Sequence, residues 1–271
     1  MLGKVIKYDF KAVARYLIPF YAVLLVSAVL ANISRMVNEN DLLKGNLVFE
    51  FSSGLITAAY VLATLLAVIG TVIILIIHYY KSFTGDEAYF TFTLPASHDT
   101  LLLGKVLNGA IWTCISLIVL ALSVCVLFAG KISIDQIKNI IQLARPIFGE
   151  IYNAFGSKSS FIAFLIVWFL IVIFVNQLEF YFCITAGQII KGHRILGAFV
   201  AYIVLKIAQQ FVSTILTLTQ YARIKDVVLE TTAVGTALSP LMWISVAELV
   251  FFAIVEYVLI SLLLRKSLNI E

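Results

Sequence analysis

The sequence predicts an all-α membrane protein with six transmembrane helices, an N-terminal amphipathic interfacial helix and a short cytoplasmic helix between the second and third spans. The first observation is composition: 62% of the 271 residues are hydrophobic and 13% are charged, and the mean hydropathy is +1.05. Soluble proteins are about half apolar and a quarter charged. The second observation is that nearly charge-free runs of about 20 residues, enough to cross a bilayer, recur six times. They lie at about 16–34, 55–77, 106–129, 161–185, 195–219 and 241–264.

The same composition excludes a soluble enzyme and a disordered chain, because disordered segments are polar and poor in aromatic residues. No segment between spans exceeds about 30 residues, which leaves no room for a catalytic or nucleotide-binding domain. We therefore expect one transmembrane domain over 1–271. The phosphate-binding pattern G-x-x-x-x-G-K-[ST] is absent. We expect no enzymatic activity and no cofactor bound by this chain. The three cysteines lie inside spans without metal-ligand spacing, so we expect no metal site and no disulfide.

The first fifteen residues predict a helix in the membrane interface. At about 100° per residue, four basic residues form one stripe and four apolar residues point the other way. The basic residues are Lys4, Lys7, Lys11 and Arg15, and the apolar residues are Val5, Ile6, Phe10 and Val13. We expect the basic stripe to contact anionic headgroups and the apolar face to enter the acyl boundary. The alternative is that these are ordinary flanking charges. Asp9 falls on the apolar face, and the sequence names no partner for it.

The orientation follows from the even number of spans, which puts both termini on one side. With cytoplasmic termini, ten Lys and Arg residues lie inside and eight outside, with Lys206 within a span. Most of the inner ten lie near span ends, where the positive-inside bias is read, so we expect cytoplasmic termini. A secretory signal at the first span is disfavoured, since its run of about 19 apolar residues is longer than the usual 7–15.

The loop between the second and third spans predicts a short helix at about 84–94. Thr84 and Glu87 have the spacing of a capping box, and Asp86 complements the helix dipole. Pro95 would end this helix, and Ser97 would cap the third span. The helix carries three aromatic residues, Tyr89, Phe90 and Phe92. Such a helix suits docking into a groove on another protein, whereas the alternative is an aromatic belt in contact with lipid headgroups.

These features together resemble the ABC-2 type permease subunits of bacterial ATP-driven exporters. The segments that carry the resemblance are Y-K-S-F-T-G-D-E-A-Y-F-T-F-T-L-P at 80–95, and Y-F-C-I-T-A-G-Q at 181–188 followed by G-H-R-I-L-G at 192–197. The resemblance implies a multi-pass subunit of the bacterial cell membrane that pairs with a second permease, a copy or a homologue. It also implies two separate ATPase subunits that hold ATP and Mg, coupled through the loop around 84–93. The family has short re-entrant helices between spans five and six, which would lie at 221–239.

Polar residues at helical spacing predict a path through the membrane. On span two they are Thr57, Tyr60, Thr64 and Thr71, with His78 in line. On span five they are Lys206, Gln210, Ser213 and Thr217, followed by Gln220. Polar side chains are expensive against lipid, so both faces should contact protein or water. The alternative for both is hydrogen bonding between packed helices. A lysine and a glutamine favour a cavity at span five.

Three acids, Glu179, Glu248 and Glu256, also lie within spans. Counting about 1.5 Å per residue from the inner end puts Lys206 roughly 16 Å deep and Glu256 about 12 Å deep, against about 9 Å for Glu179 and about 24 Å for Glu248. Because Glu256 is nearest in depth, we expect a buried ion pair between Lys206 and Glu256.

Two functions remain open from the sequence. The first is the permease subunit of an ATP-driven exporter that moves an amphipathic or hydrophobic cargo, such as a peptide or an antibiotic. The second is a secondary transporter in which a buried acid or Lys206 titrates. An intramembrane enzyme is disfavoured, since H-E-x-x-H is absent and the three histidines lie at inner span ends or in loops. No nucleic-acid partner is expected.

Overall fold

A computed structural model describes residues 2–38, 46–85, 97–130, 157–190, 192–231 and 234–267, with single positions between them. Side chains in 221–241 and after 264 lie outside this description. The described residues form long α-helices and contain no β-strand, which confirms the all-α prediction. Six of the helices are long and apolar enough to span a membrane, which confirms a multi-pass membrane protein. They are α1 (Leu2–Asn38), α2 (Leu47–Phe83), α4 (His98–Leu127), α6 (Lys158–Gly187), α7 (Arg194–Thr231) and α8 (Val234–Ser267).

Each helix begins before the apolar run that predicted it, and all but α4 also end beyond it, because polar residues continue these helices. The N-cap of α2 is Asn46, whose side chain accepts a hydrogen bond from the backbone N–H of Val48 at 3.2 Å. Ser97 caps α4 as predicted, accepting from the N–H of Thr100 at 3.3 Å. Residues 2–15 and the first span form one continuous helix, α1.

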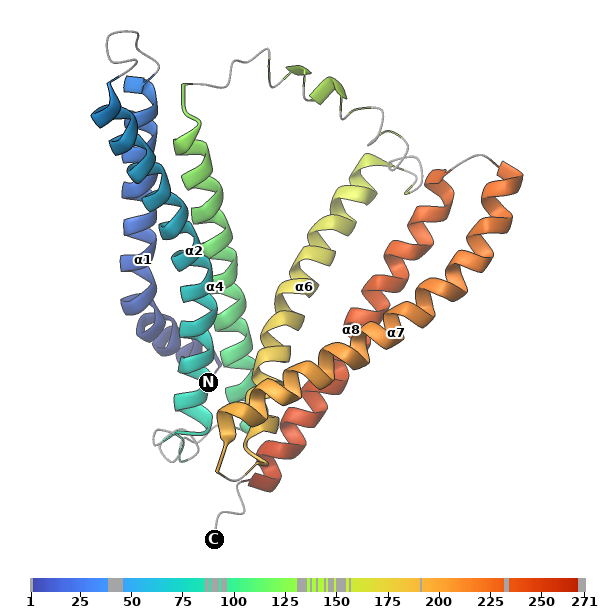
Figure 1. Cartoon of the computed structure of the whole chain (residues 1–271). Coiled ribbons are helices and arrows are strands. Elements are labelled where there is room, and N and C mark those ends of the chain that lie inside the picture. Colours follow the sequence, from blue (N-terminus) through green and yellow to red (C-terminus); the bar gives the residue numbers. More distant parts are fainter. Residues whose placement is uncertain are drawn as a thin grey trace. The chain divides into compact units, whose positions relative to one another are not determined.

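The chain divides into two compact units, Met1–Ile134 and Asp135–Glu271. We call them the N-terminal unit and the C-terminal unit. In the N-terminal unit α1 packs against both α2 and α4, and in the C-terminal unit α6 packs against both α7 and α8 (Figure 1). Each unit is therefore a three-helix assembly built around its first helix.

The core of the N-terminal unit is a seam along α1. Its buried residues recur every three or four positions, which places them on one face. They are Val13, Leu17, Tyr21, Leu24, Ala28 and Ala31. The facing part of α2 contributes Ala63 and Ala67, small side chains that let two membrane helices approach closely.

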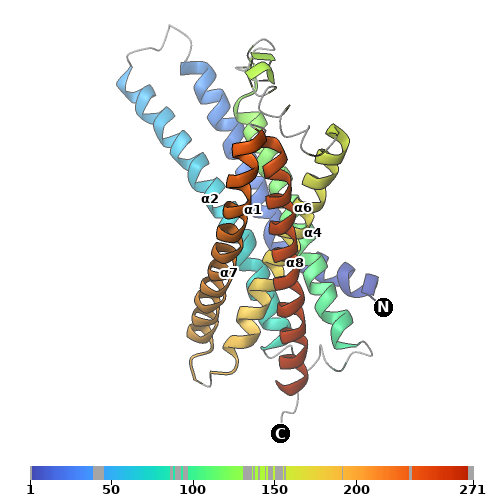
Figure 2. The ribbon, with the colours of Figure 1, turned by 90° about the vertical axis from the view of Figure 1, so that its right-hand side faces the viewer.

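The first turns of α1 run at an angle to the rest of the helix (Figure 2). Pro19 cannot donate to the carbonyl of Arg15, which weakens the helix near this bend. The predicted basic stripe is exposed. The apolar face does not point into lipid as we expected. It packs against α4, where Phe10 stacks on Trp112 with ring centroids 4.5 Å apart. Val5 fits over Gly104, at which a Cβ would lie 2.9 Å from the Val5 side chain.

In the C-terminal unit, two glycines bring the end of α6 against the start of α7. A Cβ at Gly187 would lie 2.5 Å from the backbone nitrogen of Ala198, and one at Gly197 would lie 2.8 Å from the carbonyl oxygen of Gly187. Gly192, in the connection, has a φ of +100°, which glycine adopts without steric cost. Beyond the membrane-spanning part, α7 continues to Thr231 and α8 begins at Val234, so the short separate helices expected at 221–239 are not formed.

Candidate functional site

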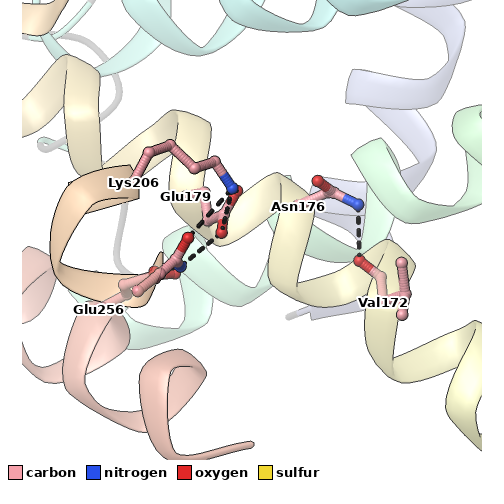
Figure 3. Close-up of polar contacts among 6 residues, drawn as sticks. Val172, Asn176, Glu179, Lys206 and Glu256 are labelled. Atoms are coloured by element: carbon pink, nitrogen blue, oxygen red, sulfur yellow. Dashed lines mark hydrogen bonds and ion pairs between the residues drawn. The ribbon is translucent and has the colours of Figure 1, made fainter. Parts of the chain in front are cut away.

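An ionic cluster in the C-terminal unit centres on Lys206. Its Nζ donates to both carboxylate oxygens of Glu179, at 2.7 and 2.9 Å, and to Oε1 of Gln209 at 3.1 Å. Figure 3 shows the ammonium group over the Glu179 carboxylate, joining α7 to α6. The Glu179 side chain is 5% exposed, while the Lys206 side chain is 41% exposed. The pair is thus buried on the acid side and open on the lysine side.

Gln209 extends this cluster to α8. Its Nε2 donates to Glu179 at 2.6 Å and lies 3.4 Å from Oε1 of Glu256, at the outer limit for a hydrogen bond. Glu256 is fully buried, and its Oε2 accepts no hydrogen bond from the described residues. The cluster of Glu179, Lys206, Gln209 and Glu256, here called the C-terminal cluster, therefore holds two carboxylates for one ammonium group.

The pairing differs from the sequence prediction, which gave Glu256 as the partner of Lys206. Depth along the helix axis was the only basis for that prediction, and it carries no information on rotation about the axis. The structure rotates Glu179 toward α7, and the long stem of Lys206 covers the difference in depth of roughly one helical turn. Glu256 belongs to the same cluster through Gln209.

A cavity of about 390 Å³ lies beside the C-terminal cluster, between α6, α7 and α8. Lys206, Gln210 and Ser213 of the polar face of span five line this cavity, and their place on a transport path stays a prediction. Thr217 is not among the lining residues, and its hydroxyl donates to the carbonyl of Ser213 instead. The other lining residues are Trp168, Val172, Val175, Asn176, Glu179, Gln209, Ser245, Glu248, Leu249 and Phe252.

On the polar face of α2, Tyr60 and Thr71 make hydrogen-bond contacts between packed helices, the alternative that the sequence left open. The Tyr60 hydroxyl lies 3.3 Å from the Ser123 hydroxyl of α4, and the Thr71 hydroxyl lies 3.1 Å from that of Tyr21 and 3.3 Å from that of Ser116. These contacts join α2 to both of its neighbours. Thr57 and Thr64 donate to carbonyls of their own helix.

A second ionic cluster supplies the partner that the sequence could not name for Asp9. Oδ1 of Asp9 accepts from Lys105 Nζ at 2.7 Å and lies 3.2 Å from His78 Nε2. Lys105 also donates to the Ser82 hydroxyl at 2.9 Å and lies 3.1 Å from His78 Nε2. The tautomer of His78 decides whether Nε2 donates to the carboxylate or accepts from the ammonium.

We call Asp9, His78, Ser82 and Lys105 the N-terminal cluster. It joins the first turns of α1 to the last turns of α2 and the first turns of α4. Sequence reasoning missed it because His78 and Lys105 lie at span ends, where polar and basic residues are ordinary. The available signal was Asp9 itself, a carboxylate on an otherwise apolar face that required a cation.

The predicted coupling helix falls largely outside the described residues, including Asp86, Glu87, Tyr89, Phe90 and Phe92. Thr84 is described and ends α2, with its backbone N–H and its hydroxyl both donating to the carbonyl of Tyr80, at 2.9 and 2.8 Å. The loop therefore leaves α2 just after Ser82 and returns to α4 seven residues before Lys105, so the N-terminal cluster holds both of its stems.

Among the described residues, no group of three or more His, Cys, Asp or Glu side chains is arranged to hold a metal ion. The chain matches no protein-family model, no curated protein and no solved structure. The resemblance to ABC-2 permeases stays a prediction, and the function is argued from the two clusters and the cavity.

Proposed function

We propose that this chain is the transmembrane permease subunit of an ATP-driven exporter in a bacterial cell membrane, with both termini in the cytoplasm. ATP and Mg would bind to separate ATPase subunits, and a second permease, a copy or a homologue, would complete the transporter. The cargo would be amphipathic or hydrophobic. In this proposal the segment at 84–94 is the coupling helix that contacts the ATPase, and its coupling residues are Thr84, Asp86, Glu87, Tyr89, Phe90 and Phe92.

The observation that carries the proposal is the attachment of this loop. Lys105 binds Ser82 at one stem and Asp9 of α1, while lying in α4 just after the other stem. A displacement of the loop would therefore act on three helices at once instead of bending one flexible connection. A subunit that receives mechanical work from a partner needs such a stiff attachment, because a loop on flexible stems would absorb the movement.

The experiment is co-purification of the ATPase with the native membrane complex. The variant Glu87→Ala/Tyr89→Ala/Phe92→Ala should lose the ATPase, since aromatic anchors supply most of the energy of such docking. Phe51→Ala, at the other end of α2 where the ring is 71% exposed, is the matched control and should retain it. Retention of the ATPase by the triple variant would contradict the role of the loop.

A topology measurement tests the same proposal independently of any partner. Ala88→Cys, in a chain whose three native cysteines are replaced, places one thiol in the loop. A membrane-impermeant thiol reagent should label this cysteine in inside-out vesicles and not in intact cells. Labelling in intact cells would put the loop outside and would end the proposal.

A second function, a secondary transporter, is favoured by one specific observation. Glu256 is fully buried with one unpartnered carboxylate oxygen, the type of intramembrane acid that takes part in proton relays. Transport in proteoliposomes without ATP that follows an imposed proton gradient, and that Glu256→Gln abolishes, would support this function over the first.

A further inference from the structure

The cavity of the C-terminal unit carries an excess of negative charge. Of its charged lining residues, Lys206 and Glu179 neutralise each other through their ion pair. Glu248 also lines the cavity and forms no hydrogen bond or ion pair with the described residues. Water-excluding walls strengthen the field of a charge, so a carboxylate left without a partner here attracts a cation.

The uncharged part of the lining combines polar side chains on α6, α7 and α8 with aromatic and aliphatic ones. Trp168 and Phe252 contribute aromatic rings, and Val172, Val175 and Leu249 contribute aliphatic surface. Trp168 is 37% exposed, so its ring is accessible to a ligand. An indole ring attracts ammonium and guanidinium groups through its negative face. A carboxylate and a tryptophan that line one cavity beside aliphatic side chains are the elements that recognise organic cations.

The length and volume of the cavity limit the size of its ligand. Trp168 precedes Glu179 by eleven residues on α6, roughly 16 Å at about 1.5 Å per residue. On α8, Glu248 precedes Glu256 by eight residues, roughly 12 Å. The volume of about 390 Å³ lies at the lower end of the range of about 300–1,000 Å³ that small-molecule sites occupy. The cavity therefore suits one small amphiphile and is too small for a folded peptide.

We infer that this cavity binds a small cationic amphiphile, with the cationic group against the Glu248 carboxylate and the Trp168 ring, and the apolar part along Val172, Leu249 and Phe252. The Lys206–Glu179 pair lines the end of the site away from Trp168 and stays neutral when the ligand binds. As a statement about cargo this inference rests on the proposed exporter function, whereas the binding itself requires no ATPase.

The test uses two probes of matched shape, 4-butylbenzylammonium and the neutral 4-butylbenzyl alcohol, titrated into the full-length chain in lipid nanodiscs by calorimetry. Empty nanodiscs correct for partition into lipid. The amine should bind at least about tenfold more tightly than the alcohol, because a charge-assisted hydrogen bond contributes about 1.5–3 kcal/mol, a factor of roughly 10 to 150. Equal affinities of the two probes would overturn the inference without any variant.

Glu248→Gln should remove most of the preference for the amine and leave the affinity for the alcohol within about twofold. The matched control is Glu50→Gln, an exposed acid of the N-terminal unit, which should change neither affinity. Trp168→Leu should weaken the amine by roughly 2- to 30-fold through the lost cation–π contact. If the Glu248→Gln variant has the stability of the unchanged protein and still prefers the amine, the assignment to Glu248 is overturned.

The two proposals can fail separately. Loss of the amine preference, with an ATPase still co-purifying, would remove the ligand and leave the exporter. Tight amine binding by a chain that never co-purifies with an ATPase would retain the ligand and remove the exporter.

Discussion

The two units of this protein each contain an ionic cluster between their helices, but the clusters differ in how far they are exposed. Each consists of three membrane-spanning helices, and each holds a lysine against a carboxylate between them. Lys105 in the N-terminal unit is 5% exposed and contacts Asp9, His78 and Ser82. Lys206 in the C-terminal unit is 41% exposed and lies beside a cavity. The first cluster is closed and the second is open.

The two clusters also differ in the number of acidic groups for each ammonium group. The N-terminal cluster sets one carboxylate against one ammonium, with a histidine between them. The C-terminal cluster sets two carboxylates against one ammonium, and Glu248 adds a third acid along the cavity wall. A closed and balanced cluster serves to hold helices together. An open cluster with excess charge of one sign is suited to a charged ligand, since its own residues do not satisfy it.

Lys105→Met should have the largest effect on this comparison. The variant leaves Asp9 charged and largely buried without its cation, which costs about 3 kcal/mol or more. We expect a clear loss of stability in a denaturant titration of the full-length chain in detergent. Lys81→Met, next to Ser82 in the sequence but exposed, is the control and should change stability by less than about 0.5 kcal/mol. Equal losses in both variants would show that the N-terminal cluster is not the element that holds the three helices.

Double-mutant cycles on Lys206 give the next effect in size. Lys206→Met combined with Glu179→Gln should show a coupling free energy of roughly 1 kcal/mol, reduced from that of a closed pair because Lys206 is partly exposed. The same cycle with Glu256→Gln should show a smaller coupling, since Gln209 lies between the two residues. A larger coupling free energy with Glu256 than with Glu179 would support the Lys206–Glu256 pair that depth alone predicted.

The smallest effect is expected at the hydroxyl contacts of α2. Tyr60→Phe and Thr71→Val should each cost about 0.6 kcal/mol, the average for hydrogen bonds between membrane helices, and should leave transport unchanged. Thr57→Val, on the exposed part of the same face, should change neither property. If transport fell while stability held, these residues would line a path after all.

Particular residues show how far the sequence could predict this fold. The six spans follow from the cost of burying charge in lipid, and that cost acts on each segment alone, so it can be read without the partners. Ser97 was a correct cap because capping depends on a few neighbouring residues. The division into two units was not predicted, because it depends on contacts between helices far apart in the sequence.

The sites were predicted only in part, for the same reason. Span five could be assigned to a cavity because Lys206 and Gln210 are too polar for lipid. The partner of Lys206 and the partner of Asp9 could not be assigned, since both depend on how neighbouring helices are rotated about their axes. For Thr71 the sequence showed that the residue faces protein, but not whether that protein surface encloses water.

The glycine contact between α6 and α7 has a consequence for the open cluster. Gly187 lies eight residues after Glu179, and Gly197 lies nine residues before Lys206, so the two helices that carry the ion pair diverge from one backbone contact. The angle between α6 and α7 therefore depends on this close contact. A methyl group at either glycine would collide with the facing backbone and push α6 and α7 apart. The spacing of the two helices at the cavity therefore depends on two glycines that lie more than ten ångströms along the helices from Glu179 and Lys206.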